Sequence, residues 1–237
     1  DVYDACHIDK IGCYTRRATF YVLATAVAYH KDITLRALRI LKEIDLVLCE
    51  DTRVTRKLFE KYQISTPTMS YHAQSGEAKV DIILEKIEEG KNIALVTDAG
   101  TPGISDPGSM LISQIREKFP ELTIIGVPGA SALTGALSIA GVPTHEFVFL
   151  GFLPHKKGRE TLFKEIASSE RTMVFCESTH RILKTLESLS KINKKVTIVR
   201  ELTKIYEEVL QGSAEEILKI LTDTPEKQKG EFVVIVS

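Results

Sequence analysis

The residues over 98–108 are the part of the chain best suited to hold a ligand. An apolar run over 93–96 leads into Asp98, a loop rich in glycine and proline follows, and apolar residues at helical spacing come next over 110–119. Glycines let the backbone approach a ligand, prolines stiffen the loop, and the carboxylates of Asp98 and Asp106 can accept hydrogen bonds from hydroxyl or ammonium groups. Ligands of open α/β sheets bind at the carboxyl ends of strands, so this loop predicts a binding site, with a simple strand-to-helix connection as the alternative.

Three further segments place polar or glycine-rich residues directly after predicted strands, at 50–53, 128–132 and 177–181. Turn-forming residues end many strands, so any one of these segments could be a simple chain reversal. A parallel sheet, however, would bring the first two beside the loop at 98–108, because the carboxyl ends of its strands meet at one edge. Their convergence is a stronger indication of a site than any single segment.

Strand and helix patterns alternate, which predicts an α/β fold with a parallel sheet and helices on both faces in the first part of the chain. Predicted strands cover 20–28, 46–49, 68–71, 93–96, 122–127, 147–152, 172–176, 196–201, 206–211 and 231–236. Predicted helices cover 35–44, 55–62, 77–89, 110–119, 131–140, 160–168, 179–190 and 213–221. We expect two α/β domains, over 19–143 and 144–237, preceded by an N-terminal arm over 1–18.

The overall charge excludes a generally basic nucleic-acid-binding protein, since 31 Lys and Arg face 32 Asp and Glu and the net charge is −1. A local basic patch is still compatible with these numbers. The four cysteines show neither C-x-x-C pairs nor zinc spacing, so we expect reduced thiols in a cytoplasmic protein. No apolar run reaches membrane-spanning length and no signal-peptide pattern opens the chain, so we expect no membrane partner.

Several common catalytic motifs are absent. The chain has no G-x-G-x-x-G dinucleotide fingerprint, no G-x-x-x-x-G-K-[ST] phosphate loop and no H-E-x-x-H zinc motif. The segment 129–133 lacks the second glycine of a nucleophile elbow. We therefore expect no resident metal and no Ser-His-Asp hydrolase.

The remaining motifs carry a family resemblance. The chain resembles the bacterial ribosomal RNA small-subunit methyltransferase I group of the tetrapyrrole-methylase superfamily, in the segments 49–57, 98–108, 127–133, 151–158, 177–181, 200–204 and 229–232. The resemblance covers about residues 20–237 in the family's order. It implies two α/β domains of the tetrapyrrole-methylase type with S-adenosylmethionine in the interdomain cleft. It also implies a homodimer that methylates the 2′-oxygen of a cytidine ribose in the decoding region of small-subunit ribosomal RNA.

The resemblance also implies which residues hold the cofactor. These expected cofactor residues come from loops of both domains: Asp98, Ala99, Gly100, Ile104, Ser131, Ala132, Glu177, Ser178, Leu202, Thr203, Gly230, Glu231 and Phe232. Apolar side chains such as Ile104 or Phe232 would face the adenine. For Phe232, plain core packing is an equally good interpretation.

A ribose 2′-hydroxyl is a poor nucleophile at neutral pH, so a nearby base would help to remove its proton. Candidate bases are Glu50, Asp51, Asp106, His180 and Glu201. We favour Asp51, at a strand end beside Arg53, and then Glu201. Structural carboxylate–arginine pairing is the alternative for Asp51, and catalysis by positioning alone is a further alternative.

Candidate phosphate contacts lie in the motif segments: Arg53, Arg56, Lys57, Lys156, Lys157, Arg159 and Arg181. A solvated surface would explain any one of them equally well. Their grouping in motifs, in a chain that is otherwise acidic, favours RNA.

One stretch departs from the family pattern. The family usually has Ala-Thr-Pro-Ile-Gly-Asn-Leu after the first strand, whereas this chain has Ala-Thr-Ala-Val-Ala-Tyr-His over 24–30. An alternative function is therefore a family member that binds RNA and cofactor with impaired turnover. Another is a methylase of a small tetrapyrrole or of a translation factor, although the basic segment 156–159 argues against a small substrate.

Overall fold

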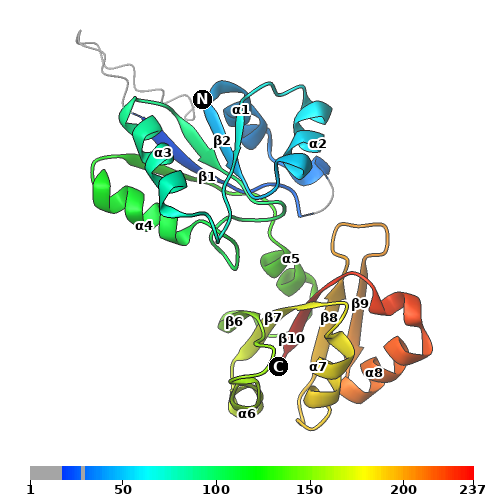
Figure 1. Cartoon of the computed structure of the whole chain (residues 1–237). Coiled ribbons are helices and arrows are strands. Elements are labelled where there is room, and N and C mark those ends of the chain that lie inside the picture. Colours follow the sequence, from blue (N-terminus) through cyan, green and yellow to red (C-terminus); the bar gives the residue numbers. More distant parts are fainter. Residues whose placement is uncertain (1–17, 28–29) are drawn as a thin grey trace.

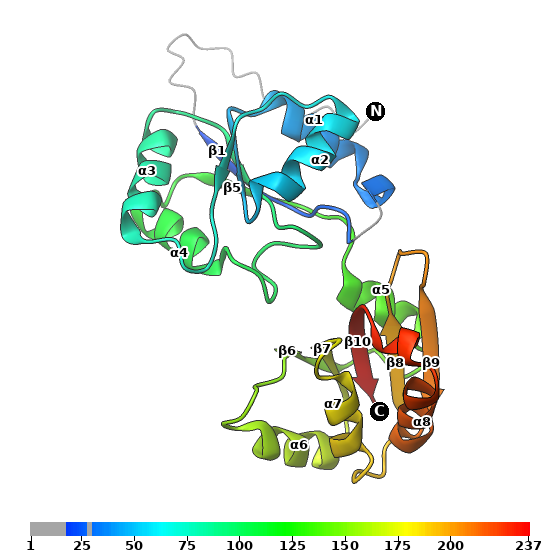
Figure 2. The same cartoon turned by 45° about the vertical axis from the view of Figure 1, so that its right-hand side comes forward.

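Two sheets organise the chain in a computed structural model that describes residues 18–27 and 30–237 (Figures 1 and 2). The arm expected over 1–18 lies outside the described residues apart from Ala18, and so do Ala28 and Tyr29 of the departing stretch. Within the described part, no helix is long and apolar enough to cross a membrane.

The first sheet is parallel throughout, with strand order β3-β2-β4-β1-β5. Its strands are β1 (Thr19–Leu23), β2 (Leu46–Cys49), β3 (Thr68–Ser70), β4 (Ile93–Leu95) and β5 (Thr123–Val127). The central strands are short apolar runs with both faces buried, as is usual in parallel sheets. The expected parallel sheet is thus confirmed.

Helices cover both faces of this sheet. α1 (Leu35–Glu43) and α2 (Thr52–Tyr62) pack on the face that carries Val47 and Val96. α3 (Glu77–Glu88) and α4 (Ser109–Lys118) pack on the opposite face, which carries Leu48 and Leu95. Successive strand residues point to opposite faces, so one strand supplies both cores.

The second sheet is mixed, with order β6-β7-β10-β8-β9, and only β6 and β7 run parallel. Its strands are β6 (Phe147–Phe152), β7 (Thr172–Ser178), β8 (Val196–Arg200), β9 (Glu208–Gly212) and β10 (Glu231–Val236). One face is covered by α6 (Arg159–Ser168), α7 (Ile182–Leu189) and α8 (Ala214–Asp223). Two short 3-10 helices, η1 (His30–Asp32) and η2 (Pro225–Gln228), complete the described elements.

The helix α5 (Ala132–Ile139) belongs to the second sheet by packing, although it follows β5 in the chain. Ala136 and Leu137 lie in one apolar cluster with Val199 and Val233, and Figure 1 shows α5 between the two halves. A Cβ on Gly135 would come within 2.9 Å of Leu202, so the glycine permits this close packing. We therefore propose a domain boundary over 128–131, earlier than the predicted 143/144.

Several element boundaries differ from the sequence-based prediction, and three of these differences follow from particular contacts. β1 ends at Leu23 rather than continuing to 28. The Ala24 N–H still donates to the Val127 carbonyl at the end of β5, but the Thr25 N–H donates to the Gly100 carbonyl in the loop after β4. α2 begins at Thr52 rather than 55, because Asp51 caps it. β7 continues to Ser178, which pairs with Glu231 of β10.

The N-terminus of α8 offers a test of local helix stability. Ser213 accepts from the Glu216 N–H while Glu216 accepts from the Ser213 N–H, which completes a capping box. We expect Ser213→Ala to lower the free energy of unfolding by about 0.5–2 kcal/mol in urea denaturation. Ser188→Ala on α7 is the control, because this half-buried hydroxyl caps no helix and only donates to the Lys184 carbonyl one turn earlier, and we expect a change within about 0.5 kcal/mol. Equal effects of the two substitutions would contradict a stabilising box.

Candidate active site

The loops that follow the strands of the first sheet meet at one edge, as the sequence predicts. The Gly100 N–H donates to the Ala26 carbonyl, and the Gly100 carbonyl accepts from the Thr25 N–H at 2.9 Å. The Asp51 N–H donates to Asp98 Oδ1 at 3.1 Å. A Cβ on Gly129 would lie 3.0 Å from the Ala24 Cβ, so the loop at 128–132 lies against the same stretch.

A cavity of about 460 Å³ opens where these loops face the second sheet. We call it the interdomain cavity. Its lining residues come from both halves: Val27, Ala99, Gly100, Ala132, Phe152, Cys176, Glu177, Ser178, Thr179, His180, Val199, Leu202, Gly230, Glu231, Phe232 and Val233. A larger hollow of about 760 Å³ lies beside Pro143 and Arg171, near the start of β7, and none of the loops that follow the strands of the first sheet line it.

The interdomain cavity contains most of the expected cofactor residues. Ala99, Gly100, Ala132, Glu177, Ser178, Leu202, Gly230, Glu231 and Phe232 line it. Four expected residues do not: Asp98 lines a smaller cavity of about 140 Å³ beside α2, Ile104 is exposed, Ser131 precedes α5, and Thr203 follows Leu202 in the β8–β9 connection.

Sequence reasoning missed several lining residues. Phe152 and Thr179 stand inside the motifs quoted above, so those motifs could have identified them. His180, expected only as a candidate base, also lines the cavity. Val27, Cys176, Val199 and Val233 look like ordinary strand residues, and nothing in the sequence marks them. Phe232 is 2% exposed and belongs to the core as well as to the cavity wall, so both interpretations of it hold.

The cavity fits S-adenosylmethionine in size and lining. Its volume lies within the range of about 300–1,000 Å³ that is usual for small-molecule sites. Gly100 has φ +77°, and a Cβ there would meet no atom within 4 Å, so the backbone lies open to the cavity. Apolar Leu202 and Phe232 together with polar Ser178 and Glu231 offer an adenine surface and hydrogen-bonding groups.

The side chain of Glu177 is buried in an ion pair. Its carboxylate is fully inaccessible and accepts from Arg181 Nε at 2.6 Å, from the Thr185 hydroxyl at 2.7 Å and from the Ser178 N–H. Arg181 also donates to the Leu153 carbonyl. Glu177 therefore shapes the cavity wall, and its inaccessible carboxylate is engaged by donors of the protein itself.

Two expected RNA contacts have structural roles instead. Arg181 is held by Glu177 and Leu153, as described above. Arg159 donates to the Pro154 carbonyl and to the Thr185 hydroxyl, and its guanidinium lies 5.0 Å from the centre of the Phe163 ring. These contacts fasten the connection between β6 and α6, so both guanidinium groups are engaged by the protein rather than presented to a phosphate.

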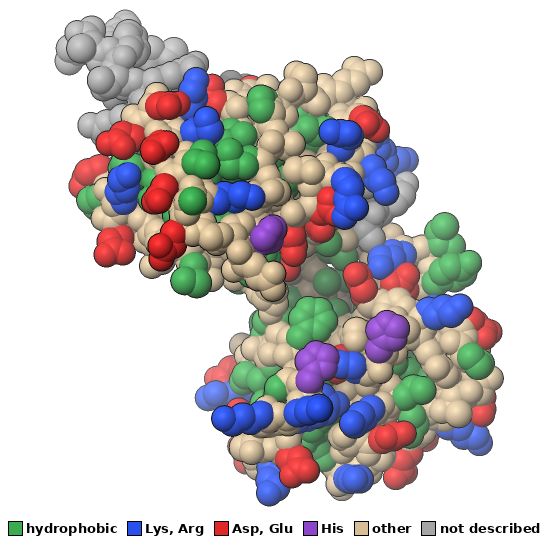
Figure 3. Space-filling model, viewed as in Figure 1, with side chains coloured by type: hydrophobic (Ala, Val, Ile, Leu, Met, Phe, Trp, Pro, Cys, Tyr) green, Lys and Arg blue, Asp and Glu red, His purple; other side chains and the backbone are tan. Residues whose placement is uncertain are grey.

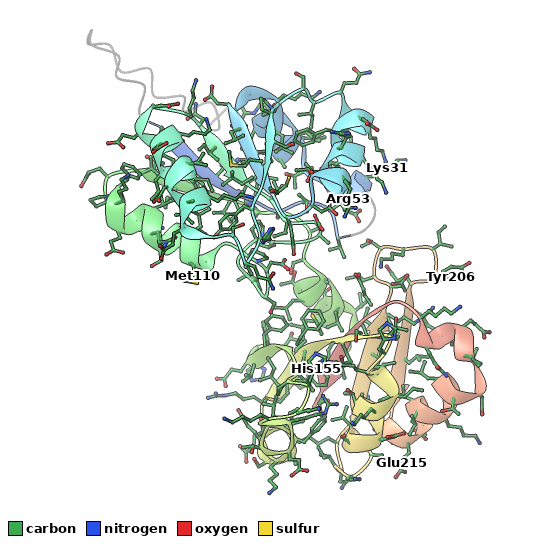
Figure 4. The ribbon with its side chains drawn as sticks, in the orientation of Figure 1. Lys31, Arg53, Met110, His155, Tyr206 and Glu215 are labelled. Carbon is green, nitrogen blue, oxygen red and sulfur yellow. The ribbon has the colours of Figure 1, made fainter. Side chains whose placement is uncertain are left out.

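The remaining expected RNA contacts are exposed. Lys156 and Lys157 lie on the β6–α6 connection, and Arg53, Arg56 and Lys57 lie on α2. The space-filling view shows basic side chains on the halves above and below the hollow between them (Figure 3). In Figure 4, Arg53 and His155 mark the two sides.

The favoured base, Asp51, instead caps α2 and pairs with Arg53. It accepts from the Arg53 N–H at 2.8 Å as the N-cap of α2, and from Arg53 Nη2 at 2.6 Å. Hydrogen bonds from the Arg53 side chain and backbone lower the pKa of Asp51 to about 2. Carboxylate–arginine pairing, the alternative given above, is what the structure contains, and so weak a base does not suit proton abstraction.

Glu201, the second choice, is also paired. It accepts from Lys204 at 2.8 Å and from the Glu231 N–H at 2.9 Å. Burial raises its pKa, but hydrogen bonds from Lys204 and from the Glu231 N–H outweigh this and lower it overall. A Cβ on Gly230, which has φ +111°, would lie 2.5 Å from the Glu201 carboxyl, so this pairing requires the glycine.

Asp106 differs from both. It is half-buried in a cavity of about 600 Å³ that also contains Glu50. Burial, followed by the charges of Glu50 and Asp98, raises the pKa of Asp106 to about 6. Among residues 18–27 and 30–237, no group of three or more His, Cys, Asp or Glu side chains is arranged to hold a metal.

Comparison with known proteins gives the family. The family model of Tetrapyrrole (Corrin/Porphyrin) Methylases matches residues 19–218. The ribosomal RNA small subunit methyltransferase I of Halalkalibacterium halodurans is 42% identical over 224 residues, which are 93% of this chain and 76% of the relative. The protein of the same name from Thermotoga maritima is 40% identical over 91% of this chain and 96% of the relative.

Solved structures share the fold at low identity. Diphthine synthase matches with a TM-score of 0.70 and 14% identity, covering 93% of this chain and 90% of that protein. The uroporphyrin-III C-methyltransferase of Thermus thermophilus in complex with S-adenosylhomocysteine matches with a TM-score of 0.62 and 17% identity, covering 92% and 97%. The chain therefore belongs to the tetrapyrrole methylase family and, within it, to the ribosomal RNA small subunit methyltransferase I family.

Proposed function

We propose that this chain transfers a methyl group from S-adenosylmethionine to the 2′-oxygen of a cytidine ribose in the decoding region of small-subunit ribosomal RNA. The observation that carries the proposal is the interdomain cavity, which brings together the motif loops of both sheets. The relatives named above, at about 40% identity over most of the chain, support ribosomal RNA as the substrate.

The residues of the interdomain cavity hold and orient the methyl donor. S-adenosylmethionine supplies a methyl group on a positively charged sulfur, which leaves as a neutral thioether and needs no acid. The backbone at Ala99 and Gly100 approaches it, while Leu202 and Phe232 enclose the apolar part. Enclosure excludes water and fixes the direction of transfer, which are the main requirements of this reaction.

The exposed lysines support a large, anionic substrate. Lys156 and Lys157 lie on a connection that Arg159 and Arg181 fasten to α7 and β7 beside the cavity. A small tetrapyrrole needs no such exposed basic segment. Ribosomal RNA offers phosphates on both sides of the acceptor nucleotide.

The stretch over 24–30, which departs from the family pattern, raises the question of whether the enzyme turns over normally. Thr25 and Ala26 keep their backbone hydrogen bonds to Gly100, so the described part of the stretch still forms the strand-end edge of the site. This favours an active enzyme over a member with impaired turnover. Transfer of labelled methyl onto purified, unmethylated small ribosomal subunits tests the proposal, and the absence of transfer at saturating cofactor would contradict it.

We also propose that the chain acts in the cytoplasm, where small subunits are found, and as a homodimer, as the family resemblance implies. Light scattering of the purified protein measures the assembly. A mass near twice 26.4 kDa is expected, and a monomer at micromolar concentration would contradict the dimer.

Cofactor binding depends on the open backbone at Gly100. We expect Gly100→Val to abolish S-adenosylmethionine binding in calorimetry, because the new side chain occupies the cavity. Gly141→Val is the matched control, since Gly141 also has positive φ and open space around it but does not line the cavity. Both variants should lose about 1–3 kcal/mol of stability through backbone strain. Equal affinity of the two variants for S-adenosylmethionine would contradict the assignment of Gly100 to the cofactor site.

RNA binding depends on the lysines of the β6–α6 connection. We expect Lys156→Ala combined with Lys157→Ala to weaken binding to small subunits. The slope of log affinity against log salt should become shallower by about 0.7–0.9 for each phosphate that a lysine no longer neutralises. Lys191→Ala combined with Lys219→Ala removes the same charge at exposed positions on the α7–β8 connection and α8, and should leave the slope unchanged. Identical slopes for both double variants would argue against this RNA interaction.

A further inference from the structure

A second cavity lies beside the interdomain cavity, at the same edge of the first sheet. It has a volume of about 600 Å³ and is formed by the loops after β2, β3 and β4, which contribute Glu50, Tyr71, Ser75 and Asp106. Met110 of α4 also lines it, and Figure 4 shows Met110 at the end of the first half that faces the second. We call this space the acceptor cavity.

Asp106 lines the acceptor cavity and lies near the wall of the interdomain cavity. Its charge acts on Cys176, which lines the interdomain cavity. The neighbouring residue Ser105 reaches β6, because its Oγ would lie 2.7 Å from a Cβ on Gly151. Gly151 stands beside Phe152, which lines the interdomain cavity. The loop that carries Asp106 therefore lies between the two spaces.

The surroundings of Asp106 keep its carboxylate basic. Glu50 from the β2–α2 loop and Asp98 from its own loop face it with like charge, and Cys176 approaches from β7. The charge of His72, from the β3–α3 loop, acts on Glu50, and the Thr97 side chain opposes the upward shift in the pKa of Asp106. Asp51 and Glu201, by contrast, are each neutralised by a cation within 2.8 Å.

We propose that Asp106 is the catalytic base of the reaction and accepts the proton of the acceptor 2′-hydroxyl, with the acceptor nucleotide held in the acceptor cavity. The inference rests on the proposed function. As the O–H bond breaks, the proton passes to a carboxylate oxygen of Asp106, and the hydroxyl oxygen forms its bond to the methyl carbon. The carbon–sulfur bond of the donor breaks with its electrons kept on sulfur, and Asp106 later releases the proton to water.

This placement explains why Asp106 is suited to the task. A base works best when its pKa lies near the working pH, and burial together with the charge of Glu50 brings the pKa of Asp106 to about 6. The carboxylate is then ionised at neutral pH, yet far more basic than Asp51, whose pKa is about 2.

Asp106→Asn tests the assignment by single-turnover methyl transfer to unmethylated small ribosomal subunits. We expect the rate at pH 8 to fall by about 10²–10⁴-fold. The parent rate should rise with pH through an inflection near 6, and Glu50→Gln should move that inflection to lower pH by removing a like charge. Asp81→Asn, at an exposed position on α3, should match the parent in rate and in inflection.

A second measurement does not depend on turnover. The native carboxyl of Asp106 keeps its proton to about pH 6, whereas the unfolded chain loses it near 3.8, so ionisation destabilises the native state as pH rises between these values. Asp106→Asn removes this cost. Its melting temperature should therefore exceed that of the parent at pH 8, with the difference vanishing by about pH 3.5. If the Asp106 carboxylate were instead paired with a cation, the melting temperature of the variant at pH 8 would be lower than that of the parent.

The outcomes separate this inference from the proposed function. Failure of the parent to methylate small subunits would contradict the function itself. An active parent with an equally active Asp106→Asn variant would overturn the base, and so would a lower melting temperature of the variant at pH 8. Weaker S-adenosylmethionine binding in calorimetry of Asp106→Asn would instead move Asp106 into the cofactor site and overturn its placement in the acceptor cavity.

Discussion

The backbone hydrogen bonds between Gly100 and residues 25 and 26 hold together the edge on which the site is built. They join the chain after β1 to the loop after β4, beyond the ends of both strands, so this loop leaves the sheet at a fixed place. Gly100 can make these bonds with its φ of +77° because it has no side chain, and the same property leaves its backbone open to a ligand. The absence of a side chain at Gly100 thus permits both the hydrogen bonds that fix the loop and the approach of a ligand to its backbone.

The second half of the chain forms the other wall of the site through two kinds of contact, apolar packing and a buried ion pair. α5 leaves the first sheet and packs on the second, where Gly135 makes room for Leu202 of the cavity wall. On the other side, the buried Glu177–Arg181 pair links β7 to the connection after β6. A buried ion pair of this kind stabilises little by itself, but breaking it leaves an uncompensated charge, so the cavity wall and the basic segment keep one arrangement.

Carboxylates of similar chemistry have different roles at this edge because their surroundings differ. Asp51 caps a helix and pairs with Arg53, Glu201 pairs with Lys204, and Asp106 is half-buried among like charges. The first two arrangements stabilise the ionised form, whereas the third destabilises it. The difference in basicity follows from desolvation and from the sign of the nearest charge, not from residue type.

The sequence by itself determined the alternation of strands and helices, the strand-end position of the loop at 98–108 and the family motifs, because these depend on local spacing and on turn chemistry. Ala99, Gly100 and Leu202, expected at the cofactor from such motifs, line the interdomain cavity. The tertiary structure alone decided which charged side chains are free. Arg159 stands in one basic segment with Lys156 and Lys157, and Arg181 stands in the motif at 177–181. Both arginines nevertheless bond to side chains and backbone carbonyls of other elements, namely Thr185, Glu177 and Leu153. Whether a charge is paired depends on residues distant in the chain, which no local pattern of the sequence records.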